Sequence, residues 1–352
     1  MKCIVLTGGG SAGHVTPHLA LLPKLADLQW DIHYIGTKNG IERDLMTGLV
    51  PYHAISAGKL RRYFDLKNFS DPFRVLQGTV EAFWILRRLR PNVILSKGGF
   101  VSLPVAVAAR SLGIPVILHE SDITPGLANR LALPFATHLC VTFPETLQYI
   151  KKASVSLTGN PIRESLFTGE AKQGYALCKF QKGKPLLLVI GGSLGASKVN
   201  QALRESLVTL TKSYQIAHIC GEGNVDTSIE MQGYTQFSYV NDELRHLFAA
   251  ADMVISRAGA NAIFELLALR KPNLLIPLSR SASRGDQIMN AKSFVTQGFS
   301  ILLAEEKLTP ESLVENIHSL AEQASKMRKT MELSPISKSS DEVMKVILEY
   351  VE

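Results

Sequence analysis

The chain has few cysteines and no long apolar run. Its four cysteines are scattered over 352 residues, with no Cys-x-x-Cys pair and no histidines at zinc spacing, so neither a disulfide framework nor a zinc site is predicted. Cys3 and Cys140 fall in apolar runs, where buried free thiols are expected. No segment approaches the roughly 20 apolar residues of a membrane span, and the opening MKCIVLTGGG lacks a secretion signal. These absences predict a cytoplasmic protein.

Signatures of several nucleotide-dependent enzymes are also missing. The first glycine turn lacks the Lys–Ser/Thr ending of a Walker loop, and no Gly-x-Gly-x-x-Gly match precedes the acidic residue of a dinucleotide site, which disfavours ATPases and dehydrogenases. No Asp-x-Asp occurs, so neither a metal ion bridging a diphosphate nor a cofactor is predicted. The 38 Lys and Arg against 31 Asp and Glu give a net charge of +7, which favours a nucleotide, a lipid head group or nucleic acid as partner.

Short apolar strands alternate regularly with helical segments, which predicts an α/β fold with parallel sheets. The length suits two Rossmann-like, doubly wound domains, because each half opens with a strand that runs into a glycine-rich turn. We predict an N-terminal domain over 1–160, a C-terminal domain over 161–334, and a last helix within 335–352 that packs back on the first domain. The predicted strands are Cys3–Thr7, Ile32–Ile35, Val93–Leu95, Pro115–His119, His138–Val141, Val155–Leu157, Pro185–Ile190, Gln215–Ile219, Asp252–Ile255 and Asn273–Pro277.

The stretch Ser256–Glu265 (SRAGANAIFE) is the most informative one in the second half. A β-branched run, a glycine-containing turn and a run of helix-forming residues follow one another, and this order predicts a strand, a tight turn and a helix. The amides at such a helix start attract phosphate, and Glu265 could accept hydrogen bonds from two adjacent sugar hydroxyls. An ordinary Rossmann-type turn with a solvated Glu265 is the alternative.

The first half carries three polar turns at predicted strand ends. Gly8–His14 (GGGSAGH) lets the backbone approach an anion, and His14 lies near a helix N-terminus, which keeps its ring neutral and able to act as a base. A structural histidine that caps the loop is the alternative. Ser96–Phe100 (SKGGF) could face the same cleft, and Leu118–Asn129 (LHESDITPGLAN) gathers polar groups where ligands bind in open sheets.

The segment Lys59–Arg90 mixes aromatic and basic residues. Such an amphipathic surface suits an anionic membrane interface, whereas the plainer interpretation is a helix face packed on the sheet. The plainer interpretation covers Val80, Phe83, Trp84 and Leu86. We predict membrane contact for Lys59–Leu76 and the core face of a helix from Phe83 onward.

The turns GGGSAGH, HES (119–121), TGNPIR (158–163), GGSLGA (191–196) and SRAGANAIFE, taken as a set in this order, resemble the MurG family over essentially the whole chain. The resemblance implies a GT-B glycosyltransferase fold, in which two Rossmann-like domains face a cleft. It implies inverting, metal-independent transfer of N-acetylglucosamine from UDP-N-acetylglucosamine to undecaprenyl-pyrophosphoryl-N-acetylmuramoyl-pentapeptide (lipid I), giving lipid II. It also implies a peripheral position at the cytoplasmic face of the cell membrane, with an anionic membrane surface and no nucleic acid as partner.

Carried over residue by residue, the resemblance makes His14 the base and Glu265 the ligand of the ribose hydroxyls. Val240 would read the uracil edge, Arg163, Ser193 and the turn ending at Ala260 would take the donor pyrophosphate, and Asp286 and Gln287 would touch the sugar. The residues implied for the acceptor are Gly9, Gly10, Ser11, Gly13, Gly98, Gly99 and Asp122. The membrane contact predicted above from the pattern of Lys59–Leu76 involves Arg61, Arg62, Phe73, Arg74 and Leu76.

The chain departs from the family pattern at three places. Ala12 stands where glycine is common, Asp122 where asparagine is frequent, and Asp286–Gln287 where a glutamine pair is usual. Ala12 narrows the room for the acceptor phosphate, and Asp122 adds a negative charge near it. The donor assignment is unaffected by these changes.

Other functions share parts of this pattern. A diacylglycerol glycosyltransferase would share the donor motifs, and only the Gly8–His14 and Ser96–Phe100 turns favour a pyrophosphate acceptor. A UDP-N-acetylglucosamine 2-epimerase would share the two-domain plan but would act on the nucleotide sugar alone. A non-enzymatic nucleotide- or RNA-binding protein is disfavoured, because the basic residues do not alternate with stacking aromatics and no RNA-binding signature occurs.

Overall fold

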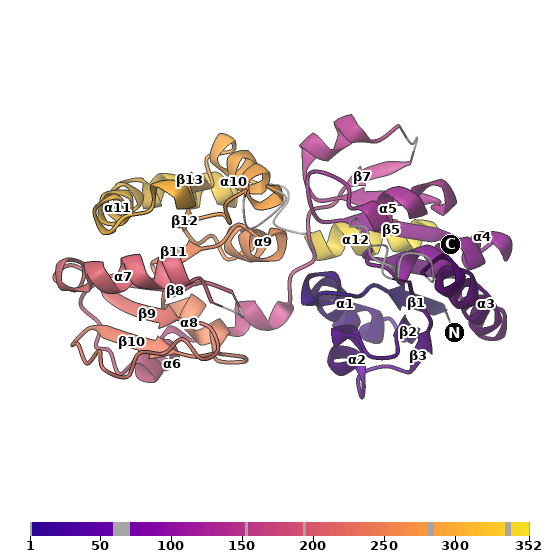
Figure 1. Ribbon diagram of the computed structural model, residues 1–352, viewed down its shortest axis with the longest axis horizontal. Helices are drawn as coiled ribbons and strands as arrows, with labels where there is room; N and C mark the ends of the chain where they lie inside the picture. The colour runs from indigo at the N-terminus through magenta and orange to yellow at the C-terminus, as the bar shows by residue number, and fades with distance from the viewer. Residues whose placement is uncertain are drawn as a thin grey trace. The chain divides into compact units, whose positions relative to one another are not determined.

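The computed structural model describes residues 2–58, 71–151, 154–192, 195–280, 285–334 and 339–351. The chain forms two compact units, one of Met1–Arg163 with Lys338–Glu352 and one of Glu164–Ser337. Each unit is an α/β domain with a parallel sheet, as the alternating pattern predicts (Figure 1). Within the described ranges, no helix is long and apolar enough to cross a membrane.

The first unit is built on a seven-stranded parallel sheet in the order β3-β2-β1-β4-β5-β6-β7. The order runs outward in both directions from the neighbours β1 and β4, so the chain changes direction along the sheet between these two strands. Ligands bind beside such a switch point in open α/β sheets, outside the carboxyl ends of the strands. The strands are β1 Cys3–Thr7, β2 Asp31–Thr37, β3 Tyr52–Ile55, β4 Val93–Ser96, β5 Val116–Glu120, β6 His138–Val141 and β7 Val155–Leu157.

Helices cover both faces of this sheet, and each face has its own buried apolar cluster. One cluster joins residues of α1 and α12, although these helices lie at opposite ends of the sequence (Figure 1). The buried side chains of α12, such as Val343 and Ile347, each stabilise the unit by about 1.5–3 kcal/mol. The helices are η1 Ala12–His14, α1 Thr16–Asp27, α2 Ile41–Met46, α3 Asp71–Leu89, α4 Ser102–Ser111, α5 Leu127–Ala132, η3 Leu133–Phe135, η4 Pro144–Tyr149 and α12 Ser339–Glu349.

The second unit repeats the plan with a six-stranded parallel sheet in the order β10-β9-β8-β11-β12-β13, whose switch point lies between β8 and β11. The strands are β8 Leu186–Ile190, β9 Gln215–Ile219, β10 Tyr234–Phe237, β11 Met253–Ser256, β12 Asn273–Leu275 and β13 Ser300–Leu302. The helices are η5 Glu164–Thr168, α6 Ala171–Cys178, α7 Ser197–Leu210, α8 Leu244–Ala250, α9 Ala260–Ala268, α10 Asp286–Thr296, η6 Glu305–Lys307 and α11 Pro310–Glu332.

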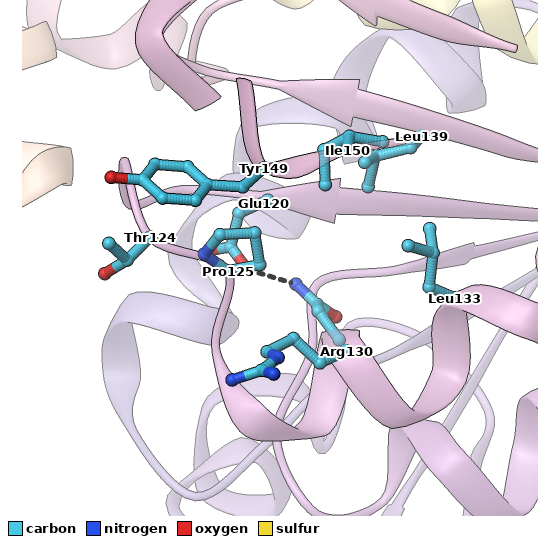
Figure 2. A pocket seen from close by; sticks show the side chains of 9 residues that line it. Glu120, Thr124, Pro125, Arg130, Leu133, Leu139, Tyr149 and Ile150 are labelled. Atoms are coloured by element: carbon cyan, nitrogen blue, oxygen red, sulfur yellow. Dashed lines mark hydrogen bonds between the residues drawn. The ribbon is translucent and has the colours of Figure 1, made fainter. Parts of the chain in front are cut away.

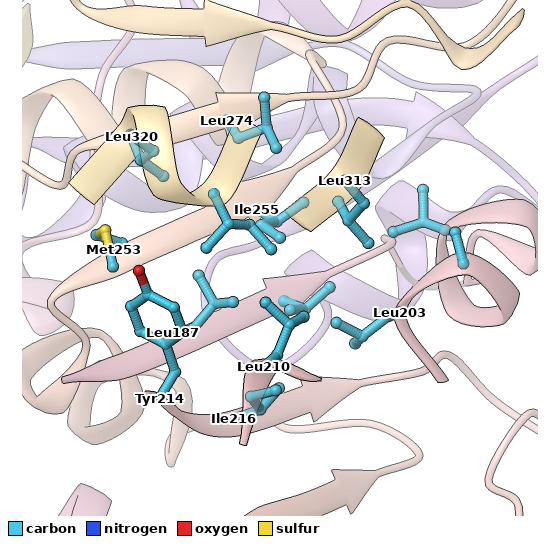
Figure 3. Close-up of a cluster of buried hydrophobic side chains, with 14 of the residues drawn as sticks. Leu187, Leu203, Leu210, Tyr214, Ile216, Met253, Ile255, Leu274, Leu313 and Leu320 are labelled. Atoms are coloured by element: carbon cyan, nitrogen blue, oxygen red, sulfur yellow. The ribbon is translucent and has the colours of Figure 1, made fainter. Parts of the chain in front are cut away.

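The core of the second unit is formed between its sheet and the helices α7 and α11. Figure 3 shows Leu187, Ile255 and Leu274 of the sheet beside Leu203 of α7 and Leu313 of α11. The long helix α11 starts at a capping box, in which Thr309 and Ser312 satisfy each other's backbone amides.

Two sequence expectations about elements were wrong or incomplete. The strands β3, β10 and β13 were not predicted, because they are only three or four residues long and pair at the outer parts of the sheets. On α3, Trp84 was predicted to face the core, yet it is 62% exposed. The helix buries Ala82 and Leu86 in the neighbouring apolar cluster, with Phe83 partly buried against it, and this turns Trp84 outward.

Candidate functional site

The glycine turns predicted to bind anions follow the strands at the two switch points. In the first unit, β1 leads into Gly8–His14 and β4 leads into Ser96–Phe100, and the strand ends Thr7 and Ser96 are paired neighbours. In the second unit, β8 leads into Gly191–Ala196 and β11 leads into Arg257–Gly259. The topology of each sheet therefore brings two glycine turns together at the edge where α/β domains bind ligands.

His14 ends the short helix η1 and is held by the turn that precedes it. Its Nδ1 lies 2.8 Å from the Gly9 carbonyl oxygen and 3.2 Å from Ser11 Oγ. A carbonyl only accepts, so this contact assigns the proton to Nδ1 and leaves a lone pair on Nε2. Burial lowers the pKa of His14, with the Gly9 hydrogen bond acting in the opposite direction. The ring is therefore neutral at pH 7 and has the form that a general base requires.

The Ser96–Phe100 turn packs directly on the Gly8–His14 turn. Gly98 and Gly99 have φ values of +89° and +83°, a region that favours glycine. A methyl group at Gly99 would overlap the backbone of Gly9, and one at Gly98 would crowd the Asn129 side chain. Glycine is thus required at Gly99 for close approach as well as for conformation.

A buried carboxylate that sequence reasoning missed lies under the first turn. Glu42 of α2 accepts hydrogen bonds from the amides of Gly10 and Thr37, each at 3.1 Å, and from the Thr37 hydroxyl. The Gly10 amide is therefore used within the protein, so binding of an acceptor phosphate in this turn must depend on other donors. Nothing in the sequence near Glu42 indicates this contact, because Glu42 and Gly10 are 32 residues apart.

The end of β5 places a second buried carboxylate beside a cavity. Glu120 accepts from the amides of Asp122 and Gly126 and from Asn129 Nδ2, at 2.9–3.0 Å, which anchors the predicted acceptor loop to α5. The adjacent cavity has a volume of about 380 Å³. Figure 2 shows Thr124 and the Tyr149 ring at one end of it and Leu133, Leu139 and Ile150 at the other.

The buried Lys97 side chain connects the loops of this region. The sequence did not predict a role for this lysine. It is 2% exposed, and its ammonium contacts His119 Nδ1 at 2.7 Å, Ser121 Oγ at 2.6 Å and Asn160 Oδ1 at 3.0 Å. His119 Nε2 lies 2.9 Å from the Gly159 carbonyl, so this nitrogen carries the proton and Nδ1 accepts from Lys97.

The turn after β11 in the second unit is braced by polar contacts that the sequence did not reveal. Arg257 donates to the Ile276 carbonyl at 3.0 Å and pairs with Glu305 at 2.5 Å. Asn290 of α10 donates to the Ala258 carbonyl at 3.3 Å. These contacts hold the turn directly before α9, which starts at Ala260.

The predicted donor residues that the structure describes belong to the second unit, with the exception of Arg163. Glu265 is half-buried on α9, Val240 lies half-buried in the loop after β10, and Arg163 ends the first unit. Asp286 and Gln287 begin α10, where Gln287 Oε1 accepts from the Leu278 amide at 3.1 Å and so also positions the loop before the helix. Ser193, Arg61 and Arg62 lie outside the described residues.

An exposed apolar stripe runs along α3. Phe73, Leu76, Val80 and Trp84 recur at helical spacing and are 75%, 63%, 52% and 62% exposed. Arg74 is exposed beside them, and the Arg87 guanidinium lies 5.9 Å from the centre of the Trp84 ring. The exposed stripe contains Phe73 and Leu76, which were predicted to face a membrane, and adds Val80 and Trp84 to them.

Comparison with known proteins places the chain in a family. Residues 4–141 match the glycosyltransferase family 28 N-terminal domain, and residues 186–347 match the glycosyltransferase family 28 C-terminal domain. The chain belongs to glycosyltransferase family 28. The first match covers β1 to β6 of the first sheet, and the second covers all of the strands of the second sheet and extends into α12.

Relatives in this family match the chain along nearly its whole length. A protein of Clostridium novyi (strain NT) is 57% identical over 99% of this chain and 98% of its own length. A protein of Geobacillus kaustophilus (strain HTA426) is 54% identical over 98% of both chains. Both are named UDP-N-acetylglucosamine--N-acetylmuramyl-(pentapeptide) pyrophosphoryl-undecaprenol N-acetylglucosamine transferase. The predicted membership of the MurG family is thereby confirmed.

Solved structures of similar fold agree with the GT-B prediction. The crystal structure of Acinetobacter baumannii MurG has a TM-score of 0.79 at 24% identity and covers 99% of this chain and 100% of its own. A putative UDP-N-acetylglucosamine 2-epimerase from Listeria monocytogenes has a TM-score of 0.68 at 10% identity, over 99% of this chain and 97% of its own. At these identities the likeness concerns the fold alone.

Proposed function

We propose that this glycosyltransferase moves N-acetylglucosamine from UDP-N-acetylglucosamine to the muramoyl sugar of an undecaprenyl-pyrophosphoryl pentapeptide, forming lipid II. The observation that carries the proposal is the 57% identity, over nearly the whole of both chains, to a transferase named for this reaction. The glycine turns at both switch points support it, because the donor and the acceptor each contain a pyrophosphate.

The second unit binds the donor. The turn after β11 and the start of α9 present amides to the pyrophosphate, and Glu265 accepts from the ribose hydroxyls. Val240 lies beside the uracil, Arg163 and Ser193 contact the phosphates, and Asp286 and Gln287 contact the sugar. The fixed positive end of α9 and the Arg163 guanidinium stabilise the negative charge that develops on the departing UDP.

The first unit binds the acceptor and supplies the base. His14 Nε2 takes the proton of the attacking sugar hydroxyl, whose oxygen forms a bond to the anomeric carbon of N-acetylglucosamine. The bond from that carbon to the UDP oxygen breaks, and its electron pair leaves with UDP. A single direct displacement inverts the anomeric configuration. The acceptor pyrophosphate is surrounded by the Asp122 loop and by Gly9, Ser11, Gly13, Gly98 and Gly99. The Gly10 amide instead donates its hydrogen bond to Glu42.

The α3 stripe binds an anionic membrane surface and brings the first unit to the lipid-linked acceptor. Phe73, Leu76, Val80 and Trp84 provide apolar area, and Arg74 and Arg87 provide positive charge. The enzyme is in this way peripheral to the cytoplasmic face of the membrane.

The decisive experiment is incubation with labelled UDP-N-acetylglucosamine and a short-chain lipid I analogue, with EDTA present. The expected product is the lipid-linked disaccharide, formed only when the acceptor is added. Epimerised sugar without acceptor would instead support the 2-epimerase alternative, and transfer to diacylglycerol but not to the lipid I analogue would support the other lipid-directed transferase.

A further inference from the structure

Lys97 joins three segments of the first unit, of which its own turn, Ser96–Phe100, is one. Its partners His119 and Ser121 both belong to the HES segment (119–121) at the end of β5, and its third partner, Asn160, belongs to the TGNPIR segment. An ammonium has three protons to donate, so these three acceptors satisfy it fully. At 2% exposure the ammonium is enclosed, and its hydrogen bonds hold the loops rather than contact a ligand.

The titratable groups around Lys97 are mostly carboxylates and neutral imidazole rings. Burial lowers the pKa of Lys97 to about 7, while Glu120 and Asp122 act to raise it. The positive charge in turn lowers the pKa of His14, beside the first glycine turn. The titratable groups that act on Lys97 or feel its charge are His14, His18, His119, Glu120, Asp122 and Cys140.

Asp122 follows the HES segment and places a carboxylate close enough to Lys97 to act on the pKa of the ammonium. An extra negative charge in a loop that surrounds a pyrophosphate should repel it. Lys97 supplies the opposite charge to the same loop, through Ser121, the neighbour of Asp122. The positive charge of Lys97 therefore offsets the negative charge of Asp122 in this loop.

We propose that Lys97 is a positioning residue for the acceptor: its buried ammonium ties the three segments together and offsets the Asp122 carboxylate, so that the acceptor pyrophosphate can bind beside it. This inference rests on the proposed function and names a determinant of the same site. It concerns the acceptor alone, because all of the partners of Lys97 lie in the first unit.

A double-mutant cycle tests the proposal. Lys97→Met keeps an unbranched side chain one atom shorter and removes its charge and its hydrogen bonds. We expect the KM for the lipid I analogue to rise roughly tenfold while the KM for UDP-N-acetylglucosamine stays within about twofold. Adding Asp122→Asn should restore part of that loss, because the negative charge that Lys97 offsets is removed together with the ammonium. A matched control is Lys271→Met in the second unit, a half-buried lysine whose pKa desolvation lowers to about 8 and which donates to the Ala251 carbonyl. This control is expected to lower thermal stability without changing the acceptor KM.

The pH dependence provides a second test in variants that keep Lys97. The acceptor KM of the wild type should rise as the pH rises through about 7, where the ammonium loses its proton. Asp122→Asn removes a charge that raises the pKa of Lys97, so this rise should move to lower pH. This test remains available if Lys97→Met does not fold, as judged by circular dichroism.

The outcomes separate the two proposals. Absence of transfer by the wild type would contradict the proposed function. With an active wild type, an unchanged acceptor KM in Lys97→Met, equal losses for donor and acceptor, or no restoration by Asp122→Asn would overturn the role of Lys97. A pH dependence that Asp122→Asn leaves in place would overturn its pairing with Asp122.

Discussion

Gly99 lies so close to Gly9 that the two predicted acceptor turns share one packed interface. A methyl group on Gly99 would overlap the Gly9 backbone, although 90 residues of sequence separate the two glycines. The pairing of Thr7 with Ser96 at the ends of β1 and β4 brings them together. The contact makes the geometry of one turn depend on the other, and it can be tested by a single added methyl group.

Gly99→Ala should reduce turnover with the lipid I analogue and lower the free energy of unfolding by about 1–3 kcal/mol, because the methyl group displaces the first turn and strains the backbone. Steady-state kinetics and thermal melts measure both effects. Gly113→Ala is the matched control, since Gly113 also has a positive φ but faces open space. Equal effects of the two substitutions on acceptor turnover would show that strain alone, and not the contact with Gly9, is responsible.

His14→Ala should lower kcat by about 10²–10⁴-fold with a near-normal melting temperature, because the proton of the attacking hydroxyl loses its acceptor. The pKa of His14 lies below its ordinary 6.5, so the base is available at neutral pH. In the wild type kcat should therefore fall only as the pH drops through that lowered pKa. Turnover near the wild-type value in His14→Ala would remove His14 as the base.

Glu265→Ala should raise the KM for UDP-N-acetylglucosamine by about ten- to a hundredfold, the size expected when hydrogen bonds to a charged group are lost. The acceptor KM should change much less. Calorimetry with UDP provides a measurement that is independent of turnover. Glu332→Ala is the control, because Glu332 is an exposed glutamate paired with Arg270. A larger effect on the acceptor than on the donor would displace Glu265 from the ribose.

Changing Phe73 and Leu76 to Ser should reduce binding to vesicles that contain anionic lipid, and adding Trp84→Ser should reduce it further, because apolar area is lost from the stripe. Vesicle sedimentation measures the binding. Val208→Ser on α7 is the control, since Val208 is 67% exposed but lies outside the stripe. Undiminished binding by the triple variant would contradict membrane contact by α3.

Transfer should be unchanged by EDTA, because the helix start of α9 and Arg163 are proposed to stabilise the UDP leaving group without a metal ion. Activity in EDTA is compared with activity after Mg²⁺ is restored. A loss in EDTA that Mg²⁺ reverses would show that a metal ion bridges the diphosphate.

Prediction from the sequence worked best where the signal was local. The strand, glycine turn and helix around Gly8–His14 and Ser256–Glu265 were predicted from residues that are neighbours in the chain, and the structure contains both. The α3 stripe was only half predicted, because its periodicity shows an apolar face but does not show which face the sheet covers. The assignment of Trp84 to the core failed for this reason.

The sequence by itself determined that this chain forms two parallel α/β units, that glycine turns follow their central strands, and which polar side chains those turns carry, since each of these is a property of short contiguous segments. Only the tertiary structure decided that Gly99 packs on Gly9, that Glu42 occupies the Gly10 amide and that Lys97 joins three segments. The partners of Lys97 lie 22, 24 and 63 residues away in the chain, and contacts at such separations arise from the order of the strands in the sheet, which no local pattern encodes.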